Sequence, residues 1–183
     1  MTDAPTTPAP ATAAVFGPAL DDPRVLRAIA LVWHEAALLD GAAYEEWQEL
    51  YAEDAHYVIP LDAPAQGCPE ARDFADALNM VYDDARMRRM RVARMTEGYA
   101  IAAVDAARTV RTVSRFVPEQ ISDTGVVLRS AQVLVAYKRG RHDLWAAEVT
   151  HRIRLAEDGD RIALKVVRLA DGEDAVPAAG FLL

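Results

Sequence analysis

The sequence has 183 residues, which suits a single domain, and 52% of them are hydrophobic, enough to fill one core. Only 7% are aromatic, so that core is expected to consist mainly of Ala, Val, Leu and Ile. The 28 acidic residues outnumber the 20 Lys and Arg residues, and the formal net charge is -8. Such a chain repels phosphate backbones and anionic lipids, which argues against nucleic-acid or membrane partners.

The cysteine content and the N-terminal segment indicate the compartment. Cys68 is the single cysteine, which excludes an intramolecular disulfide and fits a reducing environment. Residues 1–20 lack the basic start and apolar run of a signal peptide, and no segment approaches the roughly 20 apolar residues of a membrane-spanning helix. We therefore expect a cytoplasmic protein. Residues 1–20, rich in Ala, Thr and Pro, are expected to form a flexible arm before one domain over residues 21–183.

Helix signals open the domain. Asp21 or Asp22 can cap a helix in which Pro23 takes an early position, where its missing N–H does no harm. Asp40-Gly41 ends this helix. Apolar residues recur along one of its faces, at Val25, Ile29, Val32, Trp33, Ala36 and Leu39.

The following segments are shorter. The pattern predicts a helix over residues 43–51, a strand over 56–59 that stops at Pro60, loop over 61–84 with a helical turn near 72–78, and a helix over 84–95. The second half then becomes rich in β-branched residues, in runs over 109–121, 126–137, 144–155 and 161–169. Short turns join these runs, which predicts an antiparallel meander.

Helices followed by a long antiparallel sheet describe an α+β fold. A sheet of such long strands twists strongly and tends to curl around the helices that cover it. In the third run, apolar residues such as Val149 alternate with polar residues such as Glu148, so one face of the sheet is expected to be buried and the other exposed to solvent. The expected shape is a cone with a pocket between helices and sheet.

The sequence offers no metal, cofactor or catalytic motif. The four histidines are never three to five residues apart, so no helical ligand pair is present. A Rieske cluster needs two Cys and two His, and this chain has one Cys. No glycine-rich phosphate loop follows a strand, and no G-x-S-x-G motif occurs. We therefore assign no catalytic, cofactor-binding or metal residue in this chain.

Three groups of residues have a functional and a structural interpretation. Aromatic residues with one histidine are candidate pocket residues, or else core contacts, an interpretation we prefer for the aromatics: Tyr44, Trp47, Tyr51, His56 and Tyr57. The arginines between Arg86 and Arg94 form either an anion site or, as we prefer, a helix that pairs with nearby aspartates or faces another subunit. Asp54 and His56 share a strand face, which leaves open a carboxylate–imidazole pair at the pocket.

Several segments together resemble a known family. They are Leu38-Leu39-Asp40, Tyr44-Glu45-Glu46-Trp47, the run from Tyr51 to Tyr57 with Pro60, Asp83-Asp84, Arg91 to Met95 with Gly98, Arg108-Thr109 with Arg111 and Val113-Ser114, and Phe181-Leu182-Leu183. In order and spacing these motifs are similar to those of the small (β) subunits of aromatic-ring-hydroxylating dioxygenases. The sequence departs from the family at Arg115, where Asn is usual.

The resemblance implies the cone fold that is shared with scytalone dehydratase, nuclear transport factor 2 and ketosteroid isomerase. It also implies a non-catalytic structural subunit that forms a homotrimer. This subunit supports a catalytic α subunit, which carries the Rieske [2Fe-2S] cluster and the mononuclear iron. Under this interpretation the candidate subunit-interface residues are Arg91, Arg94, Arg108, Arg111 and Arg115.

The alternative is a stand-alone enzyme or binding protein of the same fold with an acid–base pocket. A ketosteroid isomerase is excluded, because Ile59 stands at the position of that family's catalytic base and its aliphatic side chain cannot accept a proton. A dehydratase needs a Tyr and a His that point together into the pocket, and Tyr57 with His56 or His151 are the candidates.

Overall fold

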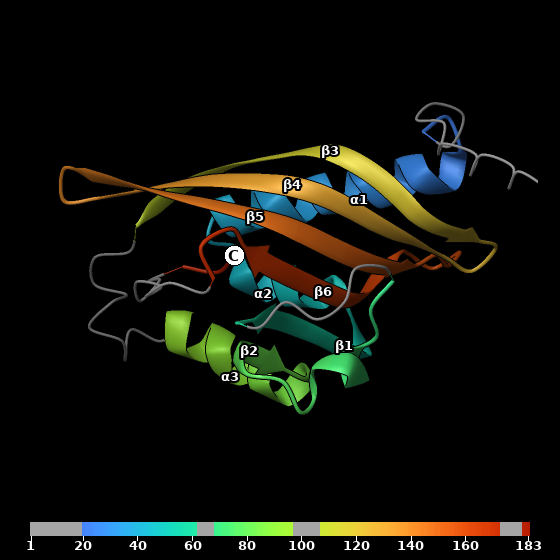
Figure 1. The fold of residues 1–183 in the computed structure, drawn as a ribbon, viewed down its shortest axis with the longest axis horizontal. Coiled ribbons are helices and arrows are strands. Elements are labelled where there is room, and N and C mark those ends of the chain that lie inside the picture. The colour runs from blue at the N-terminus through green and yellow to red at the C-terminus, as the bar shows by residue number, and fades with distance from the viewer. Residues whose placement is uncertain (1–19, 62–67, 97–106, 173–180) are drawn as a thin grey trace, which may run out of the picture.

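The computed structural model describes residues 20–61, 68–96, 107–172 and 181–183. The arm expected over residues 1–20 therefore lies outside the described residues, apart from Leu20. The elements, in chain order, are α1 (Pro23–Asp40), α2 (Tyr44–Glu49), β1 (Tyr51–Pro60), the 3₁₀ turn η1 (Ala71–Phe74), β2 (Asn79–Asp83), α3 (Ala85–Thr96), β3 (Arg108–Ser122), β4 (Gly125–Lys138), β5 (Arg141–Arg154) and β6 (Arg161–Leu169) (Figure 1).

The first helix begins as predicted. The Asp22 carboxylate accepts a hydrogen bond from the backbone N–H of Arg24 at 2.9 Å, and Pro23 opens the helix. The predicted apolar face is wrong at Trp33, whose side chain is 56% exposed. Trp33 lies about 100° around the helix from Val32, so its ring rests at the margin of the helix against Phe116 of β3, at 5.7 Å. The charged residue Glu35 is buried in the interior instead.

Within the described residues, the sheet has six strands in the order β2-β1-β6-β5-β4-β3. The meander from β3 to β6 is antiparallel, as predicted, and two-residue turns join β3 to β4 and β4 to β5. Two features were not predicted. Strand β2 lies in a segment expected to be loop, and β1 pairs with β6 in parallel, with Tyr57 beside Lys165. A pair of parallel strands needs a long connection, which here takes up most of the chain. No local sequence signal predicts such a pairing.

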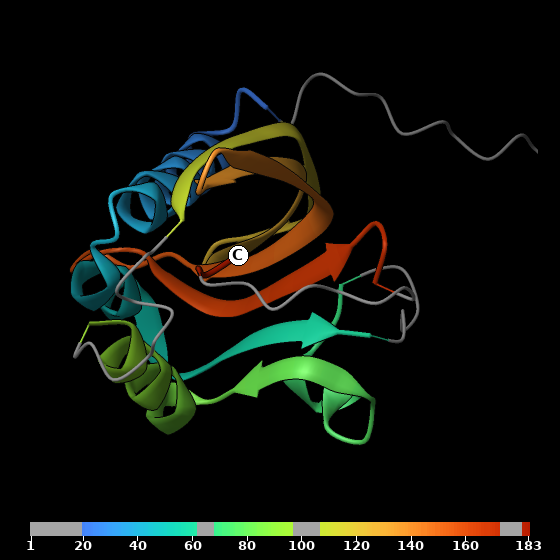
Figure 2. The same ribbon diagram turned by 90° about the vertical axis from the view of Figure 1, so that its left-hand side faces the viewer.

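The sheet bends strongly, with the helices along one side (Figure 2). Helix α1 packs on β3 and β4, and α3 packs on α2 and β1. The main core lies between these layers and includes Trp47, Tyr57, Leu134 and Val149. This is the predicted α+β cone. The register shifts at several points of the described strands. One of these is a bulge in β3 after Ser114, where Arg115 adopts a left-handed φ of 52°.

Candidate functional site

Glu35 of α1 is the centre of a polar cluster inside the cone. Its Oε1 accepts hydrogen bonds from the Trp47 indole (3.0 Å), the Tyr51 hydroxyl (3.0 Å) and the Lys165 ammonium (2.9 Å). Its Oε2 lies 2.9 Å from Nε2 of His151. A carboxylate only accepts, so this Nε2 carries the hydrogen and Nδ1 is left as an acceptor. Within the described part of the chain, nothing donates to this buried Nδ1.

The charges within the cluster compensate one another. Burial by itself would raise the pKa of the Glu35 carboxyl, but the Lys165 charge and the hydrogen bond from His151 outweigh burial and lower that pKa below its usual range. Burial lowers the pKa of Lys165, against the opposing attraction of Glu35. Burial also lowers the pKa of His151. The cluster is therefore a buried Glu35–Lys165 ion pair next to a neutral imidazole.

Residues 181–183 reach the same cluster from the other end of the chain. The backbone oxygen of Leu183 accepts hydrogen bonds from Lys165 (2.9 Å) and from the Tyr57 hydroxyl (3.1 Å). The Leu183 N–H donates to that same hydroxyl at 3.2 Å. Arg111 donates to the backbone oxygen of Leu182 at 3.1 Å and to Asp40 Oδ1 at 2.8 Å. Most polar groups of the described interior are thus bonded to groups of the chain itself, with His151 Nδ1 and Arg111 Nη1 as exceptions.

The candidate pocket residues divide into two groups. Trp47, Tyr51 and Tyr57 lie in the interior, where their polar atoms bond Glu35 or Leu183. His56 lies elsewhere, with its ring 5.2 Å from that of Tyr82. The suggested carboxylate–imidazole pair is wrong, because Asp54 instead binds Arg154 through two bonds of 2.6 and 2.7 Å. The histidine that does meet a carboxylate is His151.

Sequence reasoning missed Glu35 and Lys165, and it named His151 only as a candidate for a dehydratase pocket. Glu35 lies 116 positions before His151 and 130 positions before Lys165. Two local signals could have found them. Glu35 falls on the apolar face of its helix, three residues after Val32, and Lys165 interrupts an apolar run in β6. A charged residue at a position that periodicity assigns to the core predicts a buried partner, because an unpaired charge is costly there.

The candidate interface arginines occupy different environments. Arg111 is 8% exposed and binds Asp40, so it is an internal anchor and the prediction of an interface residue is corrected. Arg91 is half-buried and binds Asp83 of β2 through bonds of 2.5 and 3.1 Å. Arg94 is exposed and has no ion-pair partner within the described ranges. Arg108 lies over the Tyr137 ring at 4.9 Å, and the exposed Arg115 lies 3.4 Å from Glu148.

Arg88, one of the arginines between Arg86 and Arg94 that were expected to pair with aspartates or face another subunit, instead enters the core from α3. It is 3% exposed, and its guanidinium donates to the backbone oxygen of Ala55 and, at 3.3 Å, to that of Ala52. It also lies 4.6 Å from the centre of the Tyr51 ring. Helix α3 is therefore tied to β1 by one arginine and to β2 by another, while its outer arginines face solvent.

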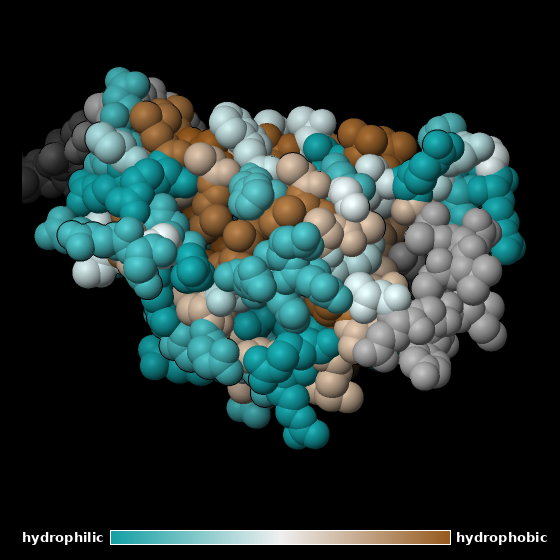
Figure 3. Space-filling model, turned by 180° about the vertical axis from the view of Figure 1, so that it is seen from behind, coloured by the Kyte–Doolittle hydropathy of each residue, from teal (hydrophilic) through white to brown (hydrophobic). Residues whose placement is uncertain are grey.

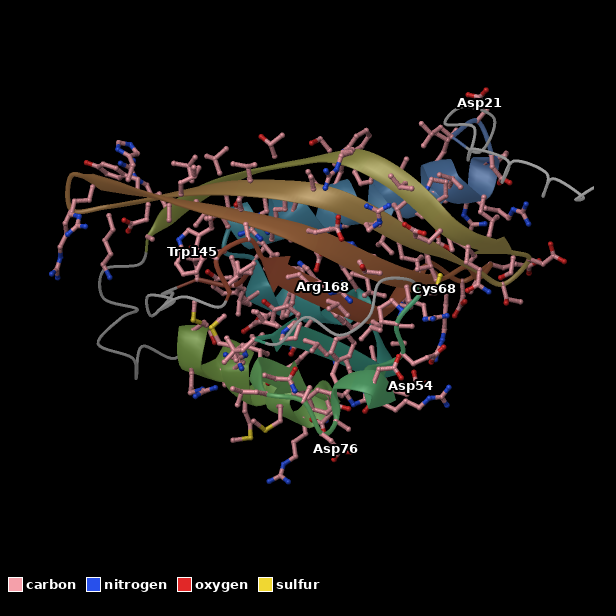
Figure 4. The ribbon with its side chains drawn as sticks, in the orientation of Figure 1. Asp21, Asp54, Cys68, Asp76, Trp145 and Arg168 are labelled. Atoms are coloured by element: carbon pink, nitrogen blue, oxygen red, sulfur yellow. The ribbon has the colours of Figure 1, made fainter. Side chains whose placement is uncertain are left out.

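No metal-binding arrangement is found among the residues that the structure describes, since none of their His, Cys, Asp and Glu side chains form a group of three or more. Cys68 and Asp54 lie at one end of the molecule, and Trp145 at the other (Figure 4). The sequence has one cysteine, and a Rieske cluster needs two, so the residues of this chain do not fit such a cluster. No helix in the described ranges is long and apolar enough to cross a membrane.

Large apolar side chains are exposed on two surfaces. On α1, Leu26 is 54% and Trp33 56% exposed, and seen from behind apolar atoms form a band over this helix (Figure 3). On the outer face of the sheet, Val110, Val135 and Leu144 are direct cross-strand neighbours and are 38–70% exposed. Contiguous exposed apolar side chains are typical of protein–protein contact surfaces.

Residues 34–172 match the family described as "Ring hydroxylating beta subunit". The chain belongs to this family. Among relatives, this β subunit is 30% identical over 135 residues to the small oxygenase component of the p-cumate 2,3-dioxygenase system of Pseudomonas putida, covering 74% of this chain and 73% of that protein. It is 31% identical over 108 residues to the biphenyl 2,3-dioxygenase β subunit of Rhodococcus jostii, covering 57% and 58%.

Solved structures carry the same fold. The β subunit of benzoate 1,2-dioxygenase from Burkholderia mallei aligns with a TM-score of 0.68 at 19% identity, over 88% of this chain and 97% of that one. A putative scytalone dehydratase from Novosphingobium aromaticivorans aligns with a TM-score of 0.60 at 12% identity, over 84% and 89%. These likenesses confirm the predicted cone fold.

Proposed function

We propose that this β subunit is the structural, non-catalytic small subunit of a multicomponent aromatic-ring-hydroxylating dioxygenase in aromatic compound catabolism. The observation that carries the proposal is the bonding of the interior side chains to one another. Each acid–base group there that a dehydratase would need is bonded to another group of the same chain: His151 to Glu35, and Tyr57 to Leu183. Such an interior suits a rigid support better than a reactive pocket.

The redox chemistry then belongs to a partner. A catalytic α subunit would carry the Rieske [2Fe-2S] cluster and the mononuclear iron, for which this chain has too few cysteines. Both subunits would work in the cytoplasm, in keeping with the single cysteine of this chain. Exposed apolar residues on α1 and on the outer face of the sheet give the β subunit surfaces for its own copies and for the α subunit.

Co-expression with an α subunit tests the proposal. We expect a stable complex whose iron content and ring-oxidising activity follow the α subunit, and a purified β subunit that is colourless and inactive. Tyr57→Phe with His151→Gln is the decisive variant, because it removes the hydroxyl and the imidazole that a dehydratase would use. Once assembled, the variant complex should keep its turnover per α subunit.

The contrary result is equally clear. A β subunit that forms no complex with any α subunit encoded beside it, and that alone turns over a hydroxylated substrate in a manner lost with Tyr57→Phe, would replace this proposal by the stand-alone enzyme.

A further inference from the structure

A small cavity lies between α2, α3 and the first residues of β1. It holds about 220 Å³, and its walls include Gln48 of α2, Ala52 of β1, and Arg88 and Arg89 of α3. Sites for drug-sized ligands measure roughly 300–1,000 Å³, so this cavity suits a smaller molecule. Glu35 does not line it, which separates the cavity from the cluster inside the cone.

Arg88 is a buried cation without a counter-ion. It is 3% exposed, and within the described ranges no carboxylate forms an ion pair with its guanidinium. Its acceptors are the backbone oxygens of Ala55 and Ala52, which carry only partial charges. These bonds use two of the five N–H groups of a guanidinium. The Tyr51 ring, whose centre lies 4.6 Å away, adds no full negative charge.

The other buried Lys and Arg side chains of the described residues are each paired with a carboxylate. Lys165 lies 2.9 Å from Glu35, and Arg111 lies 2.8 Å from Asp40. Burying a charge without a partner is costly, so Arg88 is an exception to the way this chain treats its cations. Because Arg88 lines a cavity, an anion in that cavity can supply the missing charge.

The rim of the cavity limits the charge of such an anion. Arg89 lies 3.6 Å from Glu53, so this exposed cation already has a carboxylate. Glu49 is exposed on the same rim. The two rim carboxylates disfavour an anion that carries more than one negative charge.

Gln48 adds a second polar group without a partner. Its Oε1 is buried, and no group among the described residues binds it. The orientation of this amide is therefore not fixed by the protein, and its NH₂ can turn toward an anion as a donor. A guanidinium and an amide on the walls of one cavity offer two kinds of donor to the oxygens of a single ligand.

We infer that this cavity binds a small monocarboxylate, with the guanidinium of Arg88 as its counter-ion and the amide of Gln48 as a further donor. The planar fork of a guanidinium matches the two oxygens of a carboxylate. A single negative charge balances Arg88, and it meets less repulsion from Glu49 and Glu53 than phosphate does. This inference does not depend on the proposed role in an oxygenase.

Calorimetric titration of the full-length protein at constant ionic strength provides the test. The probes are propanoate, propanamide, which has the same shape without the charge, and phosphate, which carries more charge. We expect propanoate to bind with a dissociation constant on the order of 1 mM. Propanamide and phosphate should bind at least tenfold more weakly. Propanoate should also raise the melting temperature, because it binds the folded chain.

Variants that leave Arg88 unchanged locate the binding. Ala85→Leu places a larger side chain in the wall of the cavity and should weaken propanoate binding at least tenfold. Ala93→Leu, a half-buried position of the same helix outside that wall, should not change it. Glu49→Gln removes a repelling carboxylate and should tighten binding by a few-fold, whereas Glu46→Gln, at an exposed position of α2, should leave it unchanged.

Melting curves of the variants show that each is folded, and Glu49→Gln, a change at an exposed position, keeps the test decisive if Ala85→Leu is not. Four results would overturn the inference. They are no effect of propanoate on heat or melting temperature, equal binding of propanamide, tighter binding of phosphate, and unchanged affinity in a folded Ala85→Leu protein.

Discussion

Glu35 is one carboxylate held by four donors, from α2, β1, β5 and β6. Glu35→Gln keeps the size of the side chain but removes the negative charge, which leaves the Lys165 ammonium buried without its counter-ion. Breaking one side of a buried ion pair costs about 3–5 kcal/mol. We expect a loss of that size in the free energy of unfolding, measured by urea denaturation.

Glu45→Gln is the matched control, because Glu45 is exposed on α2 and its replacement should change stability by less than about 0.5 kcal/mol. Glu35→Leu with Lys165→Met removes both charges and should cost less than Glu35→Gln alone. If the double variant is the less stable of the two, the ion pair is not what Glu35 contributes.

His151 should make the protein sensitive to mild acid. Burial lowers the pKa of folded His151 below the ordinary 6.5 of the unfolded chain. At a pH between the lowered pKa and 6.5, the unfolded chain therefore binds a proton that the folded chain does not. Stability from this group is complete above about pH 6.5 and is lost as the pH falls toward the lowered value, by at most about 1.4 kcal/mol per pH unit. Glu35, whose pKa is also lowered, adds a further loss below its ordinary 4.5.

Urea unfolding between pH 7.5 and 5 measures this slope. His151→Gln should flatten it, whereas His34→Gln, a change at an exposed histidine, should leave it as it is. An unchanged slope in the first variant would mean that His151 is not the responsible group.

Arg115 has a backbone conformation that suits its side chain poorly. Its φ of 52° lies in the left-handed region, which costs most L-residues about 1–2 kcal/mol and Asn considerably less. Arg115→Asn, which places at this bulge the residue that the family resemblance leads us to expect, should therefore stabilise the protein by up to about 1 kcal/mol. Arg115→Ala, which loses the same exposed contact with Glu148 without relieving the backbone, should not, and equal melting temperatures would contradict this explanation.

At the scale of the element, helix α3 has an inner and an outer set of arginines. Arg91→Ala should lower stability by about 2–4 kcal/mol in thermal or urea unfolding, because it leaves Asp83, whose side chain is 3% exposed, buried and unpaired. Arg94→Ala should leave the stability of the isolated chain within about 0.5 kcal/mol and should act, if at all, on assembly.

The turnover of each correctly assembled oxygenase particle should be unchanged in both variants. An Arg91→Ala protein of normal stability that assembles without activity would refute the structural role of this helix.

Sequence patterns predicted the elements whose signals are local. The Asp22 cap with Pro23 marked the start of α1, and turns such as Arg139-Gly140 marked the hairpins. Strand β2 was missed because residues 79–83 follow a stretch of sequence that contains Pro64, Gly67 and Pro69, and because nothing in their own pattern predicts their pairing with β1. The interior cluster was missed for the same reason, since His151 and Lys165 meet Glu35 only after the sheet has closed.

At the scale of the whole molecule, the prediction is self-association. A structural stem needs surfaces that bind further copies, and a ring of three requires two different faces on each subunit. Sedimentation of the purified β subunit should find a species of three 20.0 kDa chains, about 60 kDa, at micromolar concentration. A 20.0 kDa species that persists at high micromolar concentration would contradict the trimer.

The parallel pairing of β1 with β6 fixes the order in which the protein can fold during its synthesis. Strand β1 ends at Pro60, but its central neighbour begins at Arg161, so some 100 residues must be made before the two can meet. At typical elongation rates this takes on the order of 10 s. Throughout that interval the aromatic residues of α2 and β1 lack the β4, β5 and β6 residues that share their core in the folded protein. The packing of α2 and β1, which are synthesised early, is therefore completed only after β6 has been synthesised.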